Sequence, residues 1–308
     1  MKNFGLIGLA GYVAPRHLKA IKDTGNNLVS AYDTSDAVGV VDRYFPNTDF
    51  FTDQSLFEIF LTENKLDYLT ICSPNHLHYK HVCLGLKHDI NVICEKPLVL
   101  NPAEAYDLLE LEKNSGLTIN TILQLRLHPN IIELKKQVVS KMNSEIYDVE
   151  LTYITPRGKW YHTSWKGDVR KSGGIATNIG IHLFDLLTYL FGAVKESIVH
   201  LHEVDVAAGF LELENARVKW LLSTSSTIIP NCQKPLRSMN VSGDYVEFNS
   251  GFEELHTKSY QEIFTGNGFG IETVIPSIEI THEIRHTKPT GITGDYHPLL
   301  KSIQNRLP

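Results

Sequence analysis

Short apolar runs typical of β-strands alternate with amphipathic segments typical of α-helices between residues 4 and 123. Strands joined by helical connections pair in parallel, with right-handed crossovers. The alternation therefore predicts a parallel sheet. The predicted strands are residues 4–9, 27–32, 68–72, 91–94 and 118–123, and the predicted helices are residues 15–24, 56–64, 76–87 and 102–115.

The pattern changes near residue 146, where apolar and polar residues begin to alternate with the period of two that strands show. The predicted strands are residues 147–154, 197–204, 207–214, 217–224, 239–242 and 245–249. We expect a first domain over residues 1–124 and a second α/β domain over residues 125–308, built on a mostly antiparallel open sheet. The final residues, with a short helix at 299–305, are expected to pack back on the body.

Composition excludes several classes of protein. The 308 residues are 42% apolar, enough to fill two cores. The formal net charge of −6 argues against a nucleic-acid partner. No apolar run approaches the length of a membrane span, and no basic segment precedes an apolar stretch at the N-terminus, so we expect a cytoplasmic protein. The four cysteines lack C-x-x-C spacing and are expected to be reduced, without a disulfide or zinc role.

A glycine-containing turn lies between the first predicted strand and the first predicted helix. It contains Gly8, Ala10, Gly11, Tyr12 and Val13. Small residues there let the backbone approach a pyrophosphate, and the helix N-terminus supplies amide donors. The match to G-x-G-x-x-G is imperfect, because Ala10 takes the second glycine position and Val13 the third. An ordinary tight turn is the alternative.

Asp33 ends the second predicted strand. A carboxylate at this place accepts hydrogen bonds from the ribose hydroxyls and repels a 2′-phosphate, which favours NAD over NADP. A turn-capping role for Asp33 is the alternative. Together with the glycine-containing turn, Asp33 predicts a Rossmann dinucleotide-binding domain over residues 1–124.

Two further motifs carry groups suited to the oxidation of an alcohol. Lys96 follows a strand within Glu95-Lys96-Pro97, and His182 opens a helix within the glycine-rich stretch 173–185. His182 can accept a proton near neutrality, and Lys96 can stabilise a developing alkoxide or relay the proton itself. Which of the two is the base stays open, with His182 favoured; a helix-capping His182 and a surface Lys96 are the alternative.

Asn178 stands four residues before His182, on the same face of the predicted helix. Its amide cannot take a proton at neutral pH, so it can only hydrogen-bond substrate or cofactor. This leaves Lys96 and His182 as the proton-handling groups.

The motifs Ser73-Pro74-Asn75-His76-Leu77-His78, Glu95-Lys96-Pro97 and Gly173-Gly174 with His182-x-x-Asp185 resemble the Gfo/Idh/MocA oxidoreductases across nearly the whole chain. The resemblance implies that the turn at 73–75 borders the cofactor, that residues 95 and 96 lie by the nicotinamide and substrate, and that the bond before Pro97 is cis. The candidate cofactor-binding residues are Gly8, Ala10, Gly11, Tyr12, Val13, Asp33, Ser73, Asn75, His78, Glu95, Lys96, Gln124 and Trp165.

Residues 8–21, 158–167, 268–272 and 294–298 are similar to the branch of this family that oxidises C3 of UDP-N-acetylglucosaminuronate. The resemblance implies an NAD-dependent 3-dehydrogenase of a UDP-sugar acid in surface-polysaccharide (O-antigen) sugar synthesis. Its product would pass to a PLP-dependent aminotransferase. Some members are thought to recycle bound NADH with 2-oxoglutarate, and relatives form homodimers or homotetramers.

Residues 157–171 carry a charge of +4, whereas the rest of the chain carries −10. Trp160, Tyr161 and Trp165 are interleaved with these cations, which favours a site for an anionic ligand with a stackable base over a solvated loop. The candidate catalytic residues are Lys96 and His182, and the candidate substrate-binding residues are Lys96, Arg157, Tyr161, Asn178 and His182.

Two other functions were weighed against this one. A dehydrogenase of an uncharged sugar or cyclitol is disfavoured by the cationic stretch, and a non-catalytic NAD-sensing protein is disfavoured by the presence of Lys96 and His182. Arg16 and His17 were assigned to substrate, an interface or a solvated helix start. No acid or cysteine completes a plausible ligand set around His76, His78 and His81, so no metal is expected.

Overall fold

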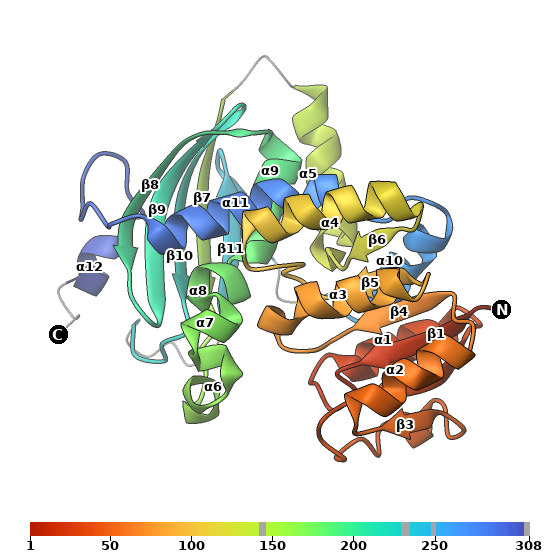
Figure 1. Cartoon of the computed structure of the whole chain (residues 1–308). Helices are drawn as coiled ribbons and strands as arrows, with labels where there is room; N and C mark the ends of the chain where they lie inside the picture. The colour runs from red at the N-terminus through yellow and green to blue at the C-terminus, as the bar shows by residue number, and fades with distance from the viewer. Residues whose placement is uncertain (142–145, 229–234, 248–250, 305–308) are drawn as a thin grey trace. The chain divides into compact units, whose positions relative to one another are not determined.

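The computed structural model describes residues 1–141, 146–228, 235–247 and 251–304, and the chain forms two compact units (Figure 1). The first unit contains Met1–Leu127 and Glu253–Ile275, and the second contains His128–Phe252 and Pro276–Pro308. The sequence pattern placed residues 253–275 in the second domain, whereas they pack within the first unit. An amphipathic helix shows that one face is buried, but not which domain buries it.

The first unit contains a six-stranded parallel sheet in the order β3-β2-β1-β4-β5-β6. Its strands are β1 (Asn3–Ile7), β2 (Asn27–Tyr32), β3 (Asp49–Phe51), β4 (Tyr68–Ile71), β5 (Asn91–Cys94) and β6 (Ile119–Thr121). Its helices are α1 (Ala14–Asp23), η1 (Val41–Arg43), α2 (Gln54–Glu63), η2 (Asn75–Leu77), α3 (His78–Lys87), α4 (Pro102–Ser115), η3 (Gln124–Leu127) and α10 (Leu255–Phe264). The five predicted strands are confirmed. Strand β3 was not predicted, because three residues are too few to show an alternation of apolar and polar side chains.

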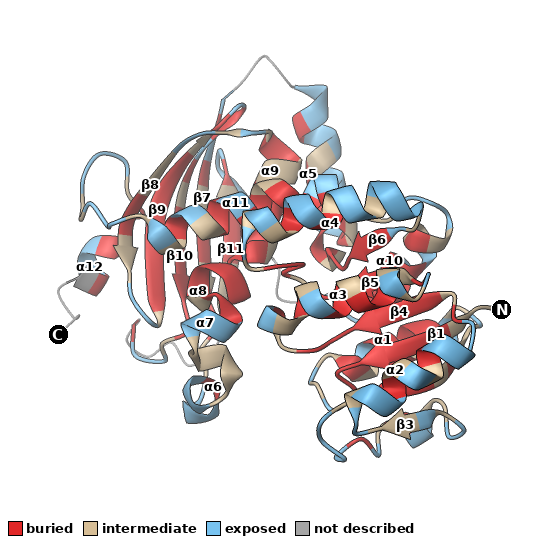
Figure 2. Cartoon of the chain, viewed as in Figure 1, coloured by how far each residue is buried: buried red, intermediate tan, exposed pale blue. Residues whose placement is uncertain are grey.

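Helices cover both faces of this sheet. Right-handed crossovers that leave β1 and β4 in opposite directions put α1 on one face and α3 on the other. Phe4 of β1, Leu18 of α1 and Tyr260 of α10 belong to one apolar cluster, so α10 packs beside α1. Figure 2 shows the central strands of this sheet buried, β3 at its edge partly exposed, and the outward faces of α2 and α4 exposed. Each fully buried large side chain contributes roughly 1.5–3 kcal/mol to stability.

The second unit contains a six-stranded sheet in the order β12-β11-β7-β10-β9-β8. Its strands are β7 (Tyr147–Ile154), β8 (Val194–His202), β9 (Val206–Leu213), β10 (Ala216–Ser223), β11 (Leu236–Val241) and β12 (Asp244–Glu247). The sheet is mixed, because β7 and β10 run parallel, so its description as mostly antiparallel was partly wrong. Alternation reports which residues face the core, but not the direction of neighbouring strands. Residues 248 and 249 of the last predicted strand, and Cys232, lie outside the described residues.

The second unit also contains helices, some of which pack against its sheet. They are α5 (Pro129–Ser140), α6 (Lys159–Thr163), η4 (Trp165–Gly167), α7 (Val169–Ser172), α8 (Gly174–Asn178), α9 (Ile181–Phe191), α11 (Ile271–His286), which begins in the first unit, and α12 (Leu300–Gln304). Phe184 of α9 packs edge-on against Trp220 of β10, with ring centroids 5.2 Å apart. Leu300 and Ile303 of α12 join an apolar cluster with Leu221 of β10, so the last helix packs on this sheet as predicted.

No single helix in the described ranges is long and apolar enough to cross a membrane. Only a helix pair bent by 43°, residues 169–178 with α9, reaches the required length and hydropathy, and most of α9 is buried within the second unit.

His297 is a fully buried histidine between the second sheet and α12. Its Nε2 atom lies 2.9 Å from the Thr152 hydroxyl oxygen, and its Nδ1 atom accepts a hydrogen bond from the Leu299 N–H at 3.3 Å. The bond from Leu299 requires a neutral ring. Burial, assisted by the charge of Lys219, lowers the pKa of His297 to about 4.

We expect this histidine to make stability depend on pH. The unfolded chain binds a proton at this site near pH 6.5, whereas the folded chain binds it only near pH 4, so the folded state loses stability as the pH falls through that window. The full effect is about 3 kcal/mol. His297→Asn, whose oxygen can replace Nδ1, should weaken the dependence of Tm on pH between 6.5 and 4, measured by thermal unfolding.

His162→Asn, at an exposed histidine of the same unit, provides the control. It should keep the wild-type dependence of Tm on pH. Equal slopes for His297→Asn and wild type would contradict the assignment.

Candidate functional site

The turn after β1 brings two backbone segments unusually close together. Gly8 has φ +92°, and its N–H donates to the Tyr32 carbonyl at 2.9 Å. A Cβ atom at Gly8 would lie 2.5 Å from the backbone of Cys72 and Ser73, so a side chain does not fit there. The first turn of α1 has no side-chain cap. Its amides and those of the turn therefore suit a pyrophosphate, as the sequence predicted.

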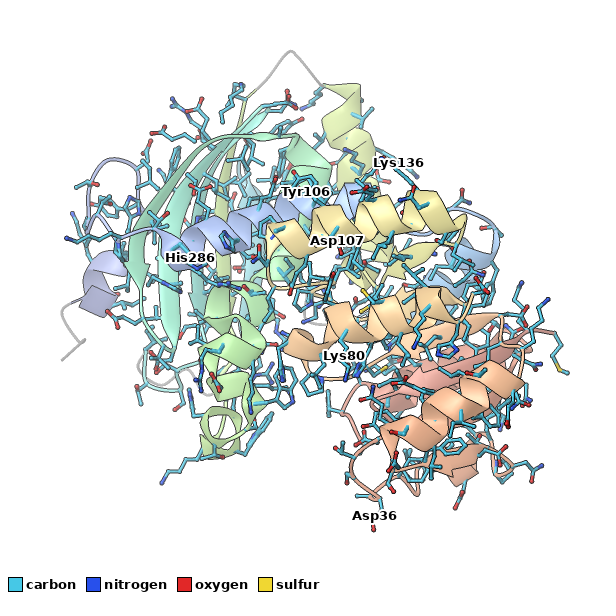
Figure 3. All side chains as sticks on the ribbon, in the orientation of Figure 1. Asp36, Lys80, Tyr106, Asp107, Lys136 and His286 are labelled. Atoms are coloured by element: carbon cyan, nitrogen blue, oxygen red, sulfur yellow. The ribbon has the colours of Figure 1, made fainter. Side chains whose placement is uncertain are left out.

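Asp33 lies directly after β2 and beside this turn. One carboxylate oxygen accepts a hydrogen bond from the Ala10 N–H and the other from the Ser35 N–H, both at 2.9 Å. Each oxygen keeps a second lone pair, so the carboxylate can also accept hydrogen bonds from two ribose hydroxyls. Figure 3 shows Asp36 on the following loop, where it adds negative charge against a 2′-phosphate.

His78 holds the turn after β4 to the segment after β5. Its ring is 1% exposed, with Nδ1 2.7 Å from the Pro97 carbonyl oxygen and Nε2 2.8 Å from the Ser73 carbonyl oxygen. Burial lowers the pKa of His78, although the two carbonyl oxygens oppose this change. Both ring nitrogens face backbone carbonyl oxygens, and the neutral ring that a lowered pKa favours donates to one of them. Direct contact of His78 or the buried Asn75 with the cofactor stays a prediction.

The neighbouring histidines do not converge on a common point. His81 is buried with Nδ1 2.8 Å from the Ser73 hydroxyl oxygen, and burial, followed by His78, lowers its pKa to about 4. His76 is exposed. In the described part of the chain, the groups close enough to hold a metal are instead His17, Glu95 and His256, whose ligand atoms lie within 4.8 Å of one another.

Glu95 is almost fully buried directly after β5. Its Oε1 atom accepts hydrogen bonds from the Nε2 atoms of His17 at 3.0 Å and of His256 at 3.1 Å. Its Oε2 atom accepts from the Lys96 N–H at 3.2 Å. Burial opposes ionisation, but the bonds from His17 and His256 outweigh it and hold the pKa of Glu95 well below its usual range.

This arrangement differs in part from what the sequence suggested. His17 is fully buried and is therefore not the surface residue that an interface or a solvated helix start would provide. Arg16 is exposed and lies over the Tyr12 ring. The Lys96–Pro97 bond is cis, as the family resemblance implied. No sequence signal connected His256 to Glu95, because 161 positions separate them.

Gln124 lies in η3, after β6. Its Oε1 atom is buried, and no hydrogen-bond partner for it exists among the described residues. An unpaired buried acceptor costs roughly 1–3 kcal/mol, so the position favours a ligand with an N–H donor. The nicotinamide carboxamide supplies such a donor. With Gly8 and Asp33, this residue makes the first unit a fit for NAD.

Three cations, Arg157, Lys166 and Arg237, lie near the end of the second sheet where strand β7 finishes. Arg157 follows β7, and Arg237 pairs with Tyr153 of β7 from the neighbouring strand β11. The Arg157 guanidinium lies 5.9 Å from the Tyr161 ring centroid, and the Lys166 ammonium lies over the Trp165 ring. Because β11 runs antiparallel to β7, the first residues of β11 pair with the last residues of β7 at this end of the sheet.

These cations form the most plausible anion site in the second unit. Burial and the charge of Arg157 lower the pKa of Lys166, as expected for cations held near one another. The Nε atoms of Arg157 and Arg237 are buried without hydrogen-bond partners, and no carboxylate within the described ranges pairs with the three cations. Arg237 was missed because it lies far beyond the cationic stretch in sequence, and only strand pairing brings it there.

Tyr161 and Asn178 lie next to this group. The Asn178 amide donates to the Tyr161 hydroxyl oxygen at 2.7 Å, and burial raises the pKa of Tyr161. Tyr161 therefore keeps its proton and can donate it to a ligand. Trp165 belongs to η4 of the same unit, so its predicted contact with the cofactor stays a prediction.

His182 lies in the first turn of α9, as predicted. Asn178 and His182 do not share one continuous helix, however, because α8 ends at Asn178 and α9 begins at Ile181. Close packing marks the break, since a Cβ atom at Gly180 would lie 2.4 Å from the Ala176 carbonyl oxygen. Lys96 belongs to the first unit and His182 to the second.

Two families of domains match this chain. Residues 2–122 match "Oxidoreductase family, NAD-binding Rossmann fold" (GFO_IDH_MocA), and residues 135–244 match "Oxidoreductase family, C-terminal alpha/beta domain" (GFO_IDH_MocA_C). These matches confirm the expected N-terminal Rossmann domain and C-terminal α/β domain.

Solved structures of a WlbA (WbpB) dehydrogenase from Thermus thermophilus are similar over nearly the whole chain. The complex with NAD and alpha-ketoglutarate is 45% identical, covers 97% of this chain and 99% of that one, and has a TM-score of 0.93. The complex with NAD and UDP-GlcNAcA is 44% identical, with the same coverage and TM-score. D-Glucoside 3-dehydrogenase of Escherichia coli K12 is 27% identical over 138 residues, which span 45% of this chain but only 39% of the relative.

We expect Asp33 to set the cofactor preference. Asp33→Ala should weaken NAD binding about tenfold, because two hydrogen bonds to a charged acceptor are lost. Asp33→Arg should raise the affinity for NADP relative to NAD. Calorimetric titration with both dinucleotides measures the two effects. Asp42→Ala, at an exposed position of η1, is the control, and unchanged NAD affinity in Asp33→Ala would contradict the assignment.

Proposed function

Because this chain belongs to the Gfo/Idh/MocA oxidoreductase family, we propose that it oxidises the C3 hydroxyl of a UDP-sugar acid, UDP-N-acetylglucosaminuronate, with NAD. The family match and the NAD-bound relatives establish an NAD-dependent oxidoreductase that acts on a CH–OH group. The identity of the substrate is the step beyond them.

The observation that carries this substrate is the group of Arg157, Lys166 and Arg237. A UDP-sugar acid brings a diphosphate, a carboxylate and a flat base. Three cations without acidic partners in the described ranges suit the anionic oxygens, and the adjacent aromatic rings suit the base or sugar. The 44% identity to a dehydrogenase solved with UDP-GlcNAcA supports the same choice. An uncharged polyol would leave these cations unpaired.

The chemistry requires removal of a hydride and a proton from one alcohol. NAD, when bound, accepts the hydride. His182 accepts the hydroxyl proton, since the free ring nitrogen lone pair of a neutral imidazole can act as a general base. Lys96 stabilises the developing alkoxide through its ammonium group. Tyr161, which Asn178 orients, donates its hydroxyl proton to a substrate oxygen.

The wider setting follows from the same proposal. The 3-keto product suits a PLP-dependent aminotransferase in surface-polysaccharide (O-antigen) sugar synthesis in the cytoplasm. 2-Oxoglutarate would regenerate NAD from NADH in the same active site, as the relative solved with alpha-ketoglutarate suggests. A homodimer or homotetramer is the expected assembly.

NADH formation at 340 nm tests the activity. We expect turnover, or a stoichiometric burst that 2-oxoglutarate converts into turnover, with UDP-N-acetylglucosaminuronate but not with UDP-N-acetylglucosamine or myo-inositol. Lys96→Ala and His182→Ala should each lower kcat about 10²–10⁴-fold, because each removes a group that handles the proton or alkoxide. Activity on myo-inositol alone would instead indicate a dehydrogenase of an uncharged cyclitol. NAD binding without any hydride transfer would favour a non-catalytic NAD-sensing protein.

Arg237 provides a sharper test of substrate choice. Arg237→Ala should raise KM for the UDP-sugar acid at least about tenfold, because a charge-assisted hydrogen bond is lost. The affinity for NAD should stay near the wild-type value. Arg170→Ala is the matched control, since its exposed guanidinium pairs with Asp168. Equal KM values for Arg237→Ala and Arg170→Ala would remove Arg237 from the substrate site.

A further inference from the structure

Helix α10, which lies late in the chain, supplies His256 as a hydrogen-bond partner of Glu95, the residue before Lys96. We propose that Glu95, held between His17 and His256, is a positioning residue that fixes the backbone of Lys96 for alkoxide stabilisation. This inference rests on the proposed role of Lys96, and it assigns to His17 and His256 a function in the reaction rather than only in folding.

The hydrogen bonds around Glu95 have a single consistent direction. Both imidazoles must carry a proton on Nε2 to donate to Oε1 of the carboxylate. His17 Nδ1 is then an acceptor, and the Tyr260 hydroxyl donates to it at 2.9 Å. The Thr70 hydroxyl donates in turn to the Tyr260 oxygen, also at 2.9 Å. His17 and Tyr260 each make two hydrogen bonds in this chain of bonds, and one carboxylate oxygen accepts from both imidazoles.

This pattern holds the carboxylate in one orientation. The two histidine donors occupy both lone pairs of Oε1, which leaves Oε2 facing the Lys96 N–H. The distances of 3.0 and 3.1 Å fit N–H···O bonds, and both Nε2 atoms share one carboxylate oxygen, so hydrogen bonds alone account for the approach of these three groups. The arrangement therefore favours a hydrogen-bonded clamp over a metal site.

Lys96 is flanked on both sides by fixed residues. The carboxylate of Glu95 holds its N–H, and His78 lies 2.7 Å from the carbonyl oxygen of Pro97, which follows it. The lysine side chain thus starts from a defined backbone position. Positional errors of about 1 Å at a reacting group can cost about 10²-fold in rate, so loosening either side should appear in kcat.

The source of the clamp is a late segment of the chain. His256 and Tyr260 stand four residues apart on one face of α10, where side chains are neighbours. Both belong to the part of the first unit that follows residue 252. The segment next to Lys96 is therefore complete only after the chain has returned to the first unit.

Glu95→Gln separates positioning from packing, because the two side chains have nearly the same shape. The glutamine oxygen must occupy the Oε1 place to accept from both histidines, so its NH₂ group faces the Lys96 N–H and that bond is lost. In the full-length protein we expect kcat to fall at least about tenfold, with less than about a threefold change in KM and little change in NAD affinity.

His256 gives a second, independent pair of variants. His256→Leu removes the donor to Glu95 and should lower kcat, whereas His256→Gln, whose amide can donate from the place of Nε2, should restore part of it. Lys258→Ala, at an exposed position of the same helix, should leave kcat unchanged. A purely structural role predicts a lower Tm with an unchanged kcat per folded enzyme, and that result would overturn the proposal.

A readout without substrate separates this proposal from the proposed function. Labelling of Lys96 by an amine-reactive reagent, followed by mass spectrometry of its peptide, should change at least about threefold in Glu95→Gln and His256→Leu, and His256→Gln should lie closer to wild type. If wild type fails to oxidise the UDP-sugar acid but labelling changes in this way, only the proposed function fails. Unchanged labelling and unchanged kcat in Glu95→Gln would refute the clamp.

Discussion

The close approach of the turn after β1 to the turn after β4 is the constraint on which the rest of the first unit depends. A side chain at Gly8 would overlap the backbone of Cys72 and Ser73, so the two strands could not keep their register. That approach leaves the α1 amides open to a pyrophosphate and sets the Ser73 carbonyl where His78 can reach it. The cofactor turn and the segment around Lys96 are therefore parts of one packed edge of the sheet.

The two units differ in whether the buried polar groups of their candidate sites have hydrogen-bond partners. In the first unit, Glu95 is ionised because two imidazoles donate to it, and His17 makes a second hydrogen bond to Tyr260. In the second unit, Arg157 and Arg237 keep buried nitrogens without partners. A satisfied network makes a rigid support, whereas unsatisfied cations favour binding of an anion. This contrast separates residues with a structural role from residues proposed to bind substrate.

Much of the candidate site was predictable from local sequence. The glycine turn, Asp33 and the helix that His182 opens are each decided by a few neighbouring residues, and the family resemblance implied the cis bond before Pro97. The failures share a cause. The parallel pairing of β7 with β10, the place of Arg237 beside Tyr153, and the reach of His256 to Glu95 all join segments far apart in sequence. Periodicity reports which side of an element is buried, but not its partner.

The sequence by itself determined the parallel sheet and the two-domain α/β class and supplied the candidate reactive groups, because period, turn sterics and side-chain chemistry act over short distances. Only the tertiary structure decided that α10 returns to the first unit, that the second sheet is mixed, and that Glu95 lies between two histidines. These features depend on which apolar faces bury one another. That choice minimises exposed surface and unpaired polar atoms over the whole chain, so no single segment encodes it.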